Sequence, residues 1–273
     1  MITFAILAHD EAATVGDAVA QALAAARSGD RVLVVDSGST DDTASRALAA
    51  GAEVVPGPLG KGAAMRLAAK NTDTPWICYL DADLIETSDN IPSLLREAAL
   101  TGPAELAMVV GEFRDPPPEP VLANTIALYP TLVRVLFPEA DGRFGRRPLS
   151  GFRVVRPDLA EGLPDDFGAE AYLNLTAAVA RRPFLVTPIG VYRQRFRYKP
   201  GMGQEIGRAI LDVAVTAGRL HPEYRPAWDQ WVASLTETIA SYRGHDKDRE
   251  AFVRHLMTAA AAPLPPAGPR GGT

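Results

Sequence analysis

Two aspartates, Asp81 and Asp83, are separated by one alanine and directly follow the apolar run at residues 76–80. In an extended segment, residues i and i+2 point to the same face, so both carboxylates can reach one cation. Mg²⁺ and Mn²⁺ prefer oxygen ligands and are commonly held by one or two carboxylates together with substrate phosphates. The pair therefore predicts a site for a metal ion and a diphosphate. The alternative is that both aspartates only cap a helix or solvate the end of a strand.

A second polar segment follows the apolar run at residues 32–35. Asp36 comes directly after this run, where its carboxylate can accept a hydrogen bond from a base N–H or a ribose hydroxyl, so we expect it to contact a nucleoside. Ser39 and Asp42 have the spacing of a capping box, which favours the start of a helix over a ligand contact.

A lysine, Lys61, stands between two glycines just before a predicted helix. Gly60 and Gly62 allow a close approach of the backbone, and the lysine can place a charge on a phosphate. The alternative is a flexible loop with a solvated lysine. The stretch is not a P-loop, because the earlier glycine and the following Ser or Thr are missing, and residues 8–11 contain no glycine for a dinucleotide-binding motif.

The elements that must position these residues alternate between strand and helix. Short β-branched runs predict strands, and helical spacing of apolar residues predicts the helices between them. The strands are expected at residues 2–7, 31–35, 53–56 and 76–80, and the helices at 11–28, 41–49 and 62–71. This order predicts an α/β fold with a mostly parallel, Rossmann-like sheet covered on both faces. Ligands of such sheets lie at the carboxyl ends of the strands, where the aspartates are.

The remainder of the chain predicts an acceptor-side half and a helical extension. Strands are expected at 105–110, 152–155 and 184–191, and helices at 91–100, 121–137 with a kink at Pro130, 170–181, and in three segments after 202. The predicted divisions are 1–112 for the nucleotide-binding half, 113–200 for the acceptor-side half, 201–262 for the C-terminal helices and 263–273 for a disordered tail.

Composition limits the class of protein. The chain has 273 residues, 28 Lys and Arg against 33 Asp and Glu, and a net charge of −5, which argues against a nucleic-acid partner. No apolar run approaches the length of a membrane span, and the acidic N-terminal segment is unlike a secretory signal, so we expect a cytoplasmic protein. The single cysteine, Cys78, cannot form an intrachain disulfide and is expected in the core.

Four motifs occur in a fixed order within the first 85 residues: residues 8–15, 35–43 (VDSGSTDDT), 60–62 (GKG) and 79–85 (YLDADLI). Together they resemble the nucleotide-sugar glycosyltransferases of the GT-A fold, family 2-like, and among these the retaining glucosyl-3-phosphoglycerate synthases and mannosylglycerate synthase-type enzymes. Residues 148–151 and 167–170 resemble acceptor-side elements of the same enzymes. The resemblance implies a GT-A fold with a helical C-terminal extension.

The resemblance also implies roles for individual residues. Ala8, Asp10 and Asp36 would hold the nucleoside, with Glu11, Ser37 and Ala82 of the same motifs counted in the donor site. Lys61 would bind the diphosphate, and Asp81 and Asp83 the donor and the Mg²⁺ or Mn²⁺ ion. Asp83 and Glu170 would be the catalytic residues, with Glu170 near the sugar or acceptor. The alternative for Glu170 is a first-turn carboxylate that is favoured by the helix dipole.

The sequence departs from the family pattern at three places. Phe152 stands where the family has an acceptor-side glutamate. Gln194 stands where the family has a histidine metal ligand, and an amide oxygen binds a hard cation less strongly than a charged group. Residues 121–124 lack the arginine and threonine that clamp the acceptor phosphate, so we expect 3-phosphoglycerate not to be the preferred acceptor. The basic residues Arg143, Arg146 and Arg147 could compensate for that loss.

The expected activity is a metal-dependent transfer of a sugar from a nucleoside diphosphate sugar to a small hydroxylated acceptor, with retention by family analogy. The C-terminal helices are expected to pack on the catalytic part or to form a homodimer. One alternative is a catalytically silent sugar-nucleotide-binding protein, which Gln194 suggests. The other is a sugar-phosphate nucleotidyltransferase, whose glycine- and arginine-rich signature after the first strand is missing.

Overall fold

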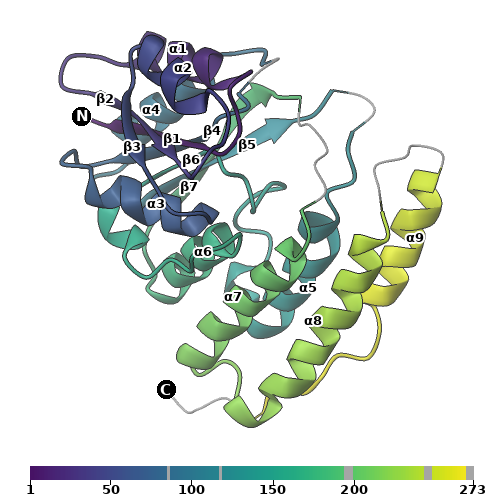
Figure 1. Cartoon of the computed structure of the whole chain (residues 1–273). Coiled ribbons are helices and arrows are strands. Elements are labelled where there is room, and N and C mark those ends of the chain that lie inside the picture. The colour runs from purple at the N-terminus through teal and green to yellow at the C-terminus, as the bar shows by residue number, and fades with distance from the viewer. Residues whose placement is uncertain (85–86, 117–118, 194–198, 243–247, 269–273) are drawn as a thin grey trace.

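A seven-stranded sheet forms the centre of the molecule (Figure 1). The computed structural model describes residues 1–84, 87–116, 119–193, 199–242 and 248–268. The strands are β1 (Thr3–Ala8), β2 (Arg31–Asp36), β3 (Glu53–Pro56), β4 (Ile77–Asp81), β5 (Met108–Arg114), β6 (Arg153–Val155) and β7 (Phe184–Val191), in the spatial order β3-β2-β1-β4-β6-β5-β7. Only the pairs that β6 makes with β4 and β5 are antiparallel. The predicted α/β fold with a mostly parallel sheet is confirmed.

Helices cover both faces of this sheet, and each face has its own apolar core. One core joins the sheet to α1 (Val15–Ala25), α2 (Thr43–Ala49) and α4 (Ile91–Thr101). The other joins it to α3 (Lys61–Lys70) and α6 (Ala169–Val179). Phe4 and Ile6 of β1 enter the first core and Ala5 enters the second, which is why the central strands read as continuous apolar runs.

The other long helices form a layer beyond α6, in the lower right of Figure 1. They are α5 (Tyr129–Leu136), α7 (Met202–Thr216), α8 (Arg225–Ala240) and α9 (Arg249–Ala260). α7 packs on α6, α5 and α8, and α8 packs on α9. Trp228, Trp231 and Leu235 of α8 are buried in the core that also contains α6, so this apolar face of α8 serves packing. Among the helices that the structure describes, none has the length and apolar character that crossing a bilayer requires.

The predicted kink near Pro130 takes the form of a π-helical turn. Residues Asn124–Leu128 have the wider π-helical pattern, and α5 begins directly after them. Pro130 lies in the first turn of α5. Because proline has no N–H, it cannot continue the regular α-helical hydrogen bonds back into the preceding turn. The irregularity therefore lies on the N-terminal side of the proline.

Two of the predicted divisions can be placed in the structure. The boundary after residue 112 falls inside β5, and β5 belongs to the same sheet as β4, so both predicted halves contribute to one sheet. Residues 263–268, expected to be disordered, lie against the helical layer, where the carbonyl of Pro266 accepts a hydrogen bond from Trp228 Nε1 and that of Ala267 from His221 N. Residues 269–273 lie outside the described residues.

Candidate active site

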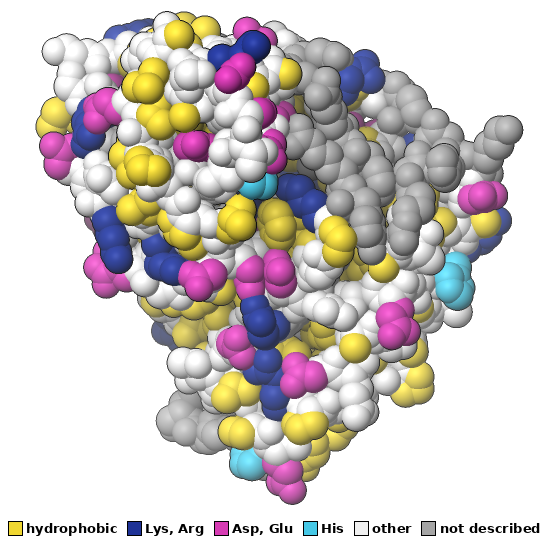
Figure 2. Space-filling model, in the orientation of Figure 1, with side chains coloured by type: hydrophobic (Ala, Val, Ile, Leu, Met, Phe, Trp, Pro, Cys, Tyr) yellow, Lys and Arg dark blue, Asp and Glu magenta, His cyan; other side chains and the backbone are white. Residues whose placement is uncertain are grey.

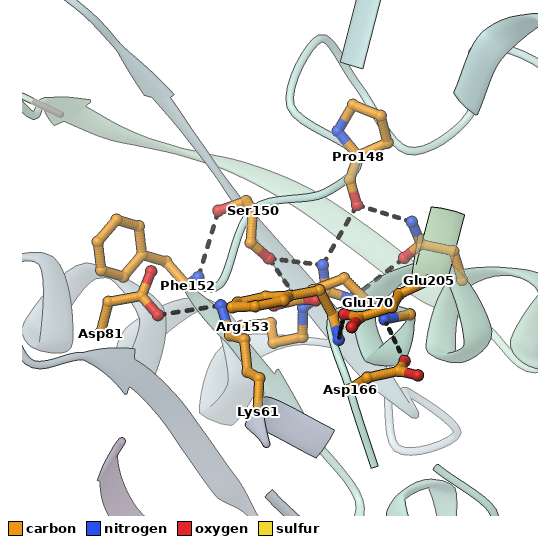
Figure 3. Close-up of polar contacts among 12 residues, drawn as sticks. Lys61, Asp81, Pro148, Ser150, Phe152, Arg153, Asp166, Glu170 and Glu205 are labelled. Atoms are coloured by element: carbon orange, nitrogen blue, oxygen red, sulfur yellow. Dashed lines mark hydrogen bonds and ion pairs between the residues drawn. The ribbon is translucent and has the colours of Figure 1, made fainter. Parts of the chain in front are cut away.

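Three of the predicted site residues meet at the carboxyl end of β4 (Figure 3). Lys61 is the first residue of α3, Asp81 the last of β4, and Glu170 lies in the first turn of α6. The ammonium Nζ of Lys61 lies 3.0 Å from Asp81 Oδ1 and 2.7 Å from Glu170 Oε1. Glu170 is buried, so it is a member of this cluster and not a solvated first-turn carboxylate.

The charges of this cluster stabilise one another. Burial alone would lower the pKa of Lys61, but Asp81 and Glu170 raise it well above its usual value. Burial alone would raise the pKa of Asp81, but Lys61, and after it Lys199, hold it below its usual value. Both side chains are therefore charged at neutral pH, which is the state that binding a metal ion and a diphosphate requires.

The glycines beside Lys61 let another loop of the chain pack closely against the start of α3. A Cβ atom on Gly60 would overlap the carbonyl of Asp165, and one on Gly62 would overlap the carbonyl of Pro164. The amide of Gly62 donates to Asp166 O. Close approach of the backbone is therefore confirmed for the chain's own loop, and the approach of a phosphate stays a prediction.

A tight turn at residues 148–151 closes another side of the cluster. A Cβ atom on Gly151 would lie 2.5 Å from Asp81 Oδ2 and 2.8 Å from Lys61 Nζ. Only glycine fits this position without moving the ion pair. The motif at 148–151 thus lies directly against Lys61 and Asp81.

Asp83 lies in a turn that follows β4, and not in the strand itself. The argument that Asp81 and Asp83 share one face of an extended segment therefore does not hold, although both stand at the same strand end. Asp83 Oδ1 accepts a hydrogen bond of 2.9 Å from the hydroxyl of Tyr192. Within the described residues, no three His, Cys, Asp or Glu side chains form a group that could hold a metal ion unaided.

An aromatic cluster holds Tyr192 in place. The rings of Phe113 and Phe152 meet the Tyr192 ring edge to face, with centroid distances of 5.3 and 5.0 Å. Phe152 is fully buried in this cluster, which explains physically why no acceptor-side carboxylate stands at that position. Gln194, the predicted third metal ligand, lies outside the described residues.

The predicted nucleoside residues lie on two loops that are bonded to each other. The amide of Ser37 donates to the carbonyl of Ala8, extending the pairing of β1 with β2. Asp10 has a left-handed backbone, with φ of 52°, and its carboxylate accepts from the amide of Thr40. Asp36 accepts a weaker bond of 3.3 Å from the amide of Ser39. Positive φ is uncommon for a residue other than glycine and concentrates at functional sites.

The predicted helix start is confirmed for Asp42, which is the N-cap residue of α2, although its side chain makes no capping hydrogen bond. The hydroxyl of Ser39 accepts from the amide of Asp10 and does not cap α2. Asp41 performs that task, since its Oδ1 accepts from the amide of Thr43. The hydroxyl of Thr43 in turn accepts from the amide of Glu11, so Glu11 is a buried residue that joins the loops.

Lys199 was missed by the sequence reasoning. It lies at the exposed rim of the site, with Nζ 4.5 Å from the centre of the Phe167 ring. Desolvation, and then the nearby Lys61, lower its pKa, while Asp81 and Asp83 oppose this shift. One signal was available: the chain has only four lysines among 28 basic residues, and two of them lie here.

The basic residues at 143–147 do not form one cluster. Arg147 pairs with the buried Asp115 at 2.6 Å, whereas Arg143 stacks on Phe184. The structure thus does not support a shared acceptor site made of these arginines. On the face shown in Figure 2, acidic and basic side chains are interspersed.

Known proteins resemble this chain in sequence and in fold. An uncharacterized glycosyltransferase of Mycobacterium tuberculosis is 42% identical over 76 residues, which are 28% of this chain and 35% of that protein; one of Mycobacterium bovis matches equally. The match thus spans about a third of these relatives.

Solved structures match over much more of the chain. Glucosyl-3-phosphoglycerate synthase of M. tuberculosis, in complex with Mn²⁺, UDP-glucose and phosphoglyceric acid, superposes with a TM-score of 0.66 and 25% identity, covering 80% of this chain and 79% of that one. A complex of the same enzyme with glycerol 3-phosphate matches equally well. The family model of glycosyl transferase family 2 matches residues 3–145, more than half of the chain. This chain belongs to glycosyl transferase family 2.

Proposed function

We propose that the chain transfers a sugar from a nucleoside diphosphate sugar to a small hydroxylated acceptor in a metal-dependent reaction. The observation that carries this proposal is the meeting of Lys61, Asp81 and Glu170 at the carboxyl end of β4. A cation between two carboxylates, at the ligand side of an α/β sheet, suits a site where a charged leaving group departs beside a hydroxyl acceptor.

Asp81 and Asp83 would hold the metal ion together with the diphosphate of the donor. Two carboxylates at one strand end, with substrate phosphates as the other ligands, fit Mg²⁺ or Mn²⁺. The enzyme of similar fold binds Mn²⁺ with UDP-glucose. When bound, the ion would neutralise the charge that develops on the departing diphosphate. Tyr192 would orient Asp83 through its hydroxyl.

Lys61 and Lys199 would supply the protein's own positive charge to the leaving group. Lys61 is held by Asp81 in the present structure. When Asp81 serves a divalent ion, Lys61 would keep its contact with Glu170 and turn its remaining N–H donors to the diphosphate. Glu170 would then face the sugar or acceptor side of the same cluster. Retention of the anomeric configuration rests on the family resemblance alone.

The first test is a calorimetric titration of the protein with UDP, in the presence and in the absence of Mn²⁺ at about the protein concentration. The second test measures sugar release and sugar transfer from UDP-glucose. Metal-dependent binding together with release or transfer supports the proposal. Binding without either reaction, across a panel of nucleoside diphosphate sugars and acceptors, would favour a silent sugar-nucleotide-binding protein.

We further propose that the chain forms a homodimer through its C-terminal helices, in addition to their packing on the rest of the molecule. Light scattering coupled to size-exclusion chromatography tests this directly. A monomer at all accessible concentrations would exclude it.

A further inference from the structure

Arg153 has a fully buried side chain next to the site, yet it has no role in the function proposed so far. It is the first residue of β6, the short strand between β4 and β5. Its Nη2 donates to the carbonyl of Ser150 at 2.6 Å and to that of Pro148 at 3.2 Å, and its Nε also donates to Ser150 O. The guanidinium therefore donates hydrogen bonds to the backbone of the turn at residues 148–151 from its buried side.

Asn174 of α6 completes this arrangement. Its Oδ1 accepts from Arg153 Nη1 at 3.2 Å, and its Nδ2 donates to Pro148 O at 2.7 Å and to Tyr129 Oη at 3.1 Å. Arg153 and Asn174 thus fasten the turn to the same helix whose first turn carries Glu170. On its other side the turn brings Gly151 against Asp81 and Lys61.

Packing alone does not account for an arginine here. Among the described residues, no carboxylate forms an ion pair with Arg153, and its hydrogen-bond partners are neutral. The carboxylates of Glu170 and Asp81 act on it only through charge at longer range. Burying a charge without a directly paired opposite charge is costly, and a buried ionic group can often be replaced by an apolar one without loss of stability. What the guanidinium provides is a planar fork that reaches two successive carbonyls at once.

We propose that Arg153 is a positioning residue of the transfer site: it fixes the turn at 148–151 so that Gly151 keeps Asp81 and Lys61 in their places. This inference rests on the proposed function, because it assigns those two residues to the metal and the diphosphate. Arg153 acts through the turn and does not itself touch the donor.

The test compares Arg153→Met with Arg156→Met. Arg156, three residues further on, also donates to backbone carbonyls, those of Leu106, Pro75 and Ala104, but at the other end of β4. We expect Arg153→Met to lose at least about tenfold in Mn²⁺-dependent UDP affinity and in kcat, as is usual when a supporting residue is removed from a metal site. Arg156→Met should lower the melting temperature and leave both quantities within about twofold.

Arg153→Lys distinguishes the effect of the positive charge from that of the planar guanidinium, which can donate to two carbonyls at once. Lysine retains the charge but cannot bond both carbonyls, so it should recover less than half of the lost activity. A folded Arg153→Met with kcat and UDP affinity within about twofold of the wild type overturns the proposal. If Arg153→Met does not fold, Asn174→Ala takes its place, since it removes one bond to the carbonyl of Pro148 in the same turn and one bond that holds Arg153. A folded Asn174→Ala with unchanged values overturns the proposal equally.

A structural measurement distinguishes this proposal from the proposed function. If the wild type neither binds UDP with Mn²⁺ nor uses any nucleoside diphosphate sugar, the proposed function fails. A crystal structure of Arg153→Met then still tests the positioning. We expect the turn to move away from Asp81, and an unmoved turn overturns the inference.

Discussion

The ammonium of Lys61 lies 2.7 Å from Glu170 Oε1, which ties the first residue of one helix to the first turn of another more than 100 residues later in the chain. Lys61 belongs to the nucleotide-side motifs, whereas Glu170 belongs to the acceptor-side motifs. Their ion pair therefore makes the two sides of the site electrostatically dependent on each other, and a change at one should be felt at the other.

Replacing Lys61 with methionine should lower kcat by about 100-fold or more, because the site loses a fixed cation at the leaving group. It also leaves Glu170 buried without its partner, so the melting temperature should fall. Steady-state kinetics and a thermal melt check both effects. Lys70→Met, at the exposed end of the same helix, is the matched control and should behave as the wild type. Unchanged kinetics in Lys61→Met would remove this residue from the site.

Asp83→Ala should abolish transfer and greatly weaken metal-dependent binding of a nucleoside diphosphate, because a single carboxylate cannot hold the ion against the diphosphate. Tyr192→Phe, which removes the hydroxyl bonded to Asp83, should cost about tenfold in metal affinity. Calorimetry with UDP, in the presence and absence of Mn²⁺, measures both. Equal metal-dependent affinity in Asp83→Ala and the wild type would contradict the assignment.

Lys199→Met should raise the KM for the donor by about tenfold and change the acceptor KM little, because the lysine lies among the charges of the diphosphate side. The loss should shrink as salt is added, since an exposed cation at the rim is screened. Initial rates at two ionic strengths test this. An effect confined to the acceptor KM would place Lys199 on the other side of the site.

3-Phosphoglycerate should not be the preferred acceptor. The expected phosphate clamp is absent at residues 121–124, and Arg147, which could have replaced it, is paired with Asp115. Charge-assisted bonds contribute about 1.5 to 3 kcal/mol each, so two missing bonds cost about 100-fold or more in affinity. Rates with phosphoglycerate, neutral polyols, sugars and cyclitols decide the matter, and the highest kcat/KM on phosphoglycerate would refute the prediction.

Asp30 should contribute to stability only above acidic pH. Its buried carboxylate accepts hydrogen bonds from the amide of Ile2 and from Arg96 Nε. Burial would raise the pKa of Asp30, but the bonds from Arg96 and two backbone amides hold it below its usual value. The contribution is therefore complete above the unfolded-state pKa of about 3.9 and is lost as the pH falls through the lower folded-state pKa.

Asp30→Asn tests this dependence. The NH₂ group of the asparagine would replace one carboxylate oxygen and face N–H groups that now donate to that oxygen. We therefore expect the free energy of unfolding to fall by about 2 kcal/mol at pH 7. The difference should shrink as the pH falls through the lowered folded-state pKa of Asp30, where its carboxylate becomes protonated. Urea unfolding at pH 7 and over a series of acidic pH values measures it. A difference that does not change with pH would show that the charge of Asp30 contributes nothing.

The sequence was sufficient for the residues that follow strands. Asp36 and Asp81 could be identified because apolar runs mark β2 and β4, and parallel strands end at one edge. The packing of another loop against the glycines beside Lys61 could not be predicted, because that loop lies about 100 residues further along the chain. Contacts of that kind leave no local pattern in the sequence.

The supporting residues were not predictable for the same reason. Arg153 belongs to a strand of three residues, too short for an alternating pattern, and its partners come from a turn and from α6. Tyr192 follows the end of β7, where the pairing with β5 is irregular after Glu112, and its partner Asp83 lies more than 100 residues earlier in the chain. The rarity of lysine in a chain rich in arginine is a weak indication of a functional residue, but it does point to both Lys61 and Lys199.

The antiparallel strand β6 has a consequence for folding. Strands β1 to β4 can pair as soon as they are synthesised, whereas β5 pairs only with β6 and β7, which follow much later in the chain. Until residues 153–155 arrive, one edge of β4 and both edges of β5 have no partner, and unpaired edges invite aggregation. A nascent chain that stalls after β5 should therefore depend on chaperones, and the last segment to enter the sheet's interior is the one that carries Arg153.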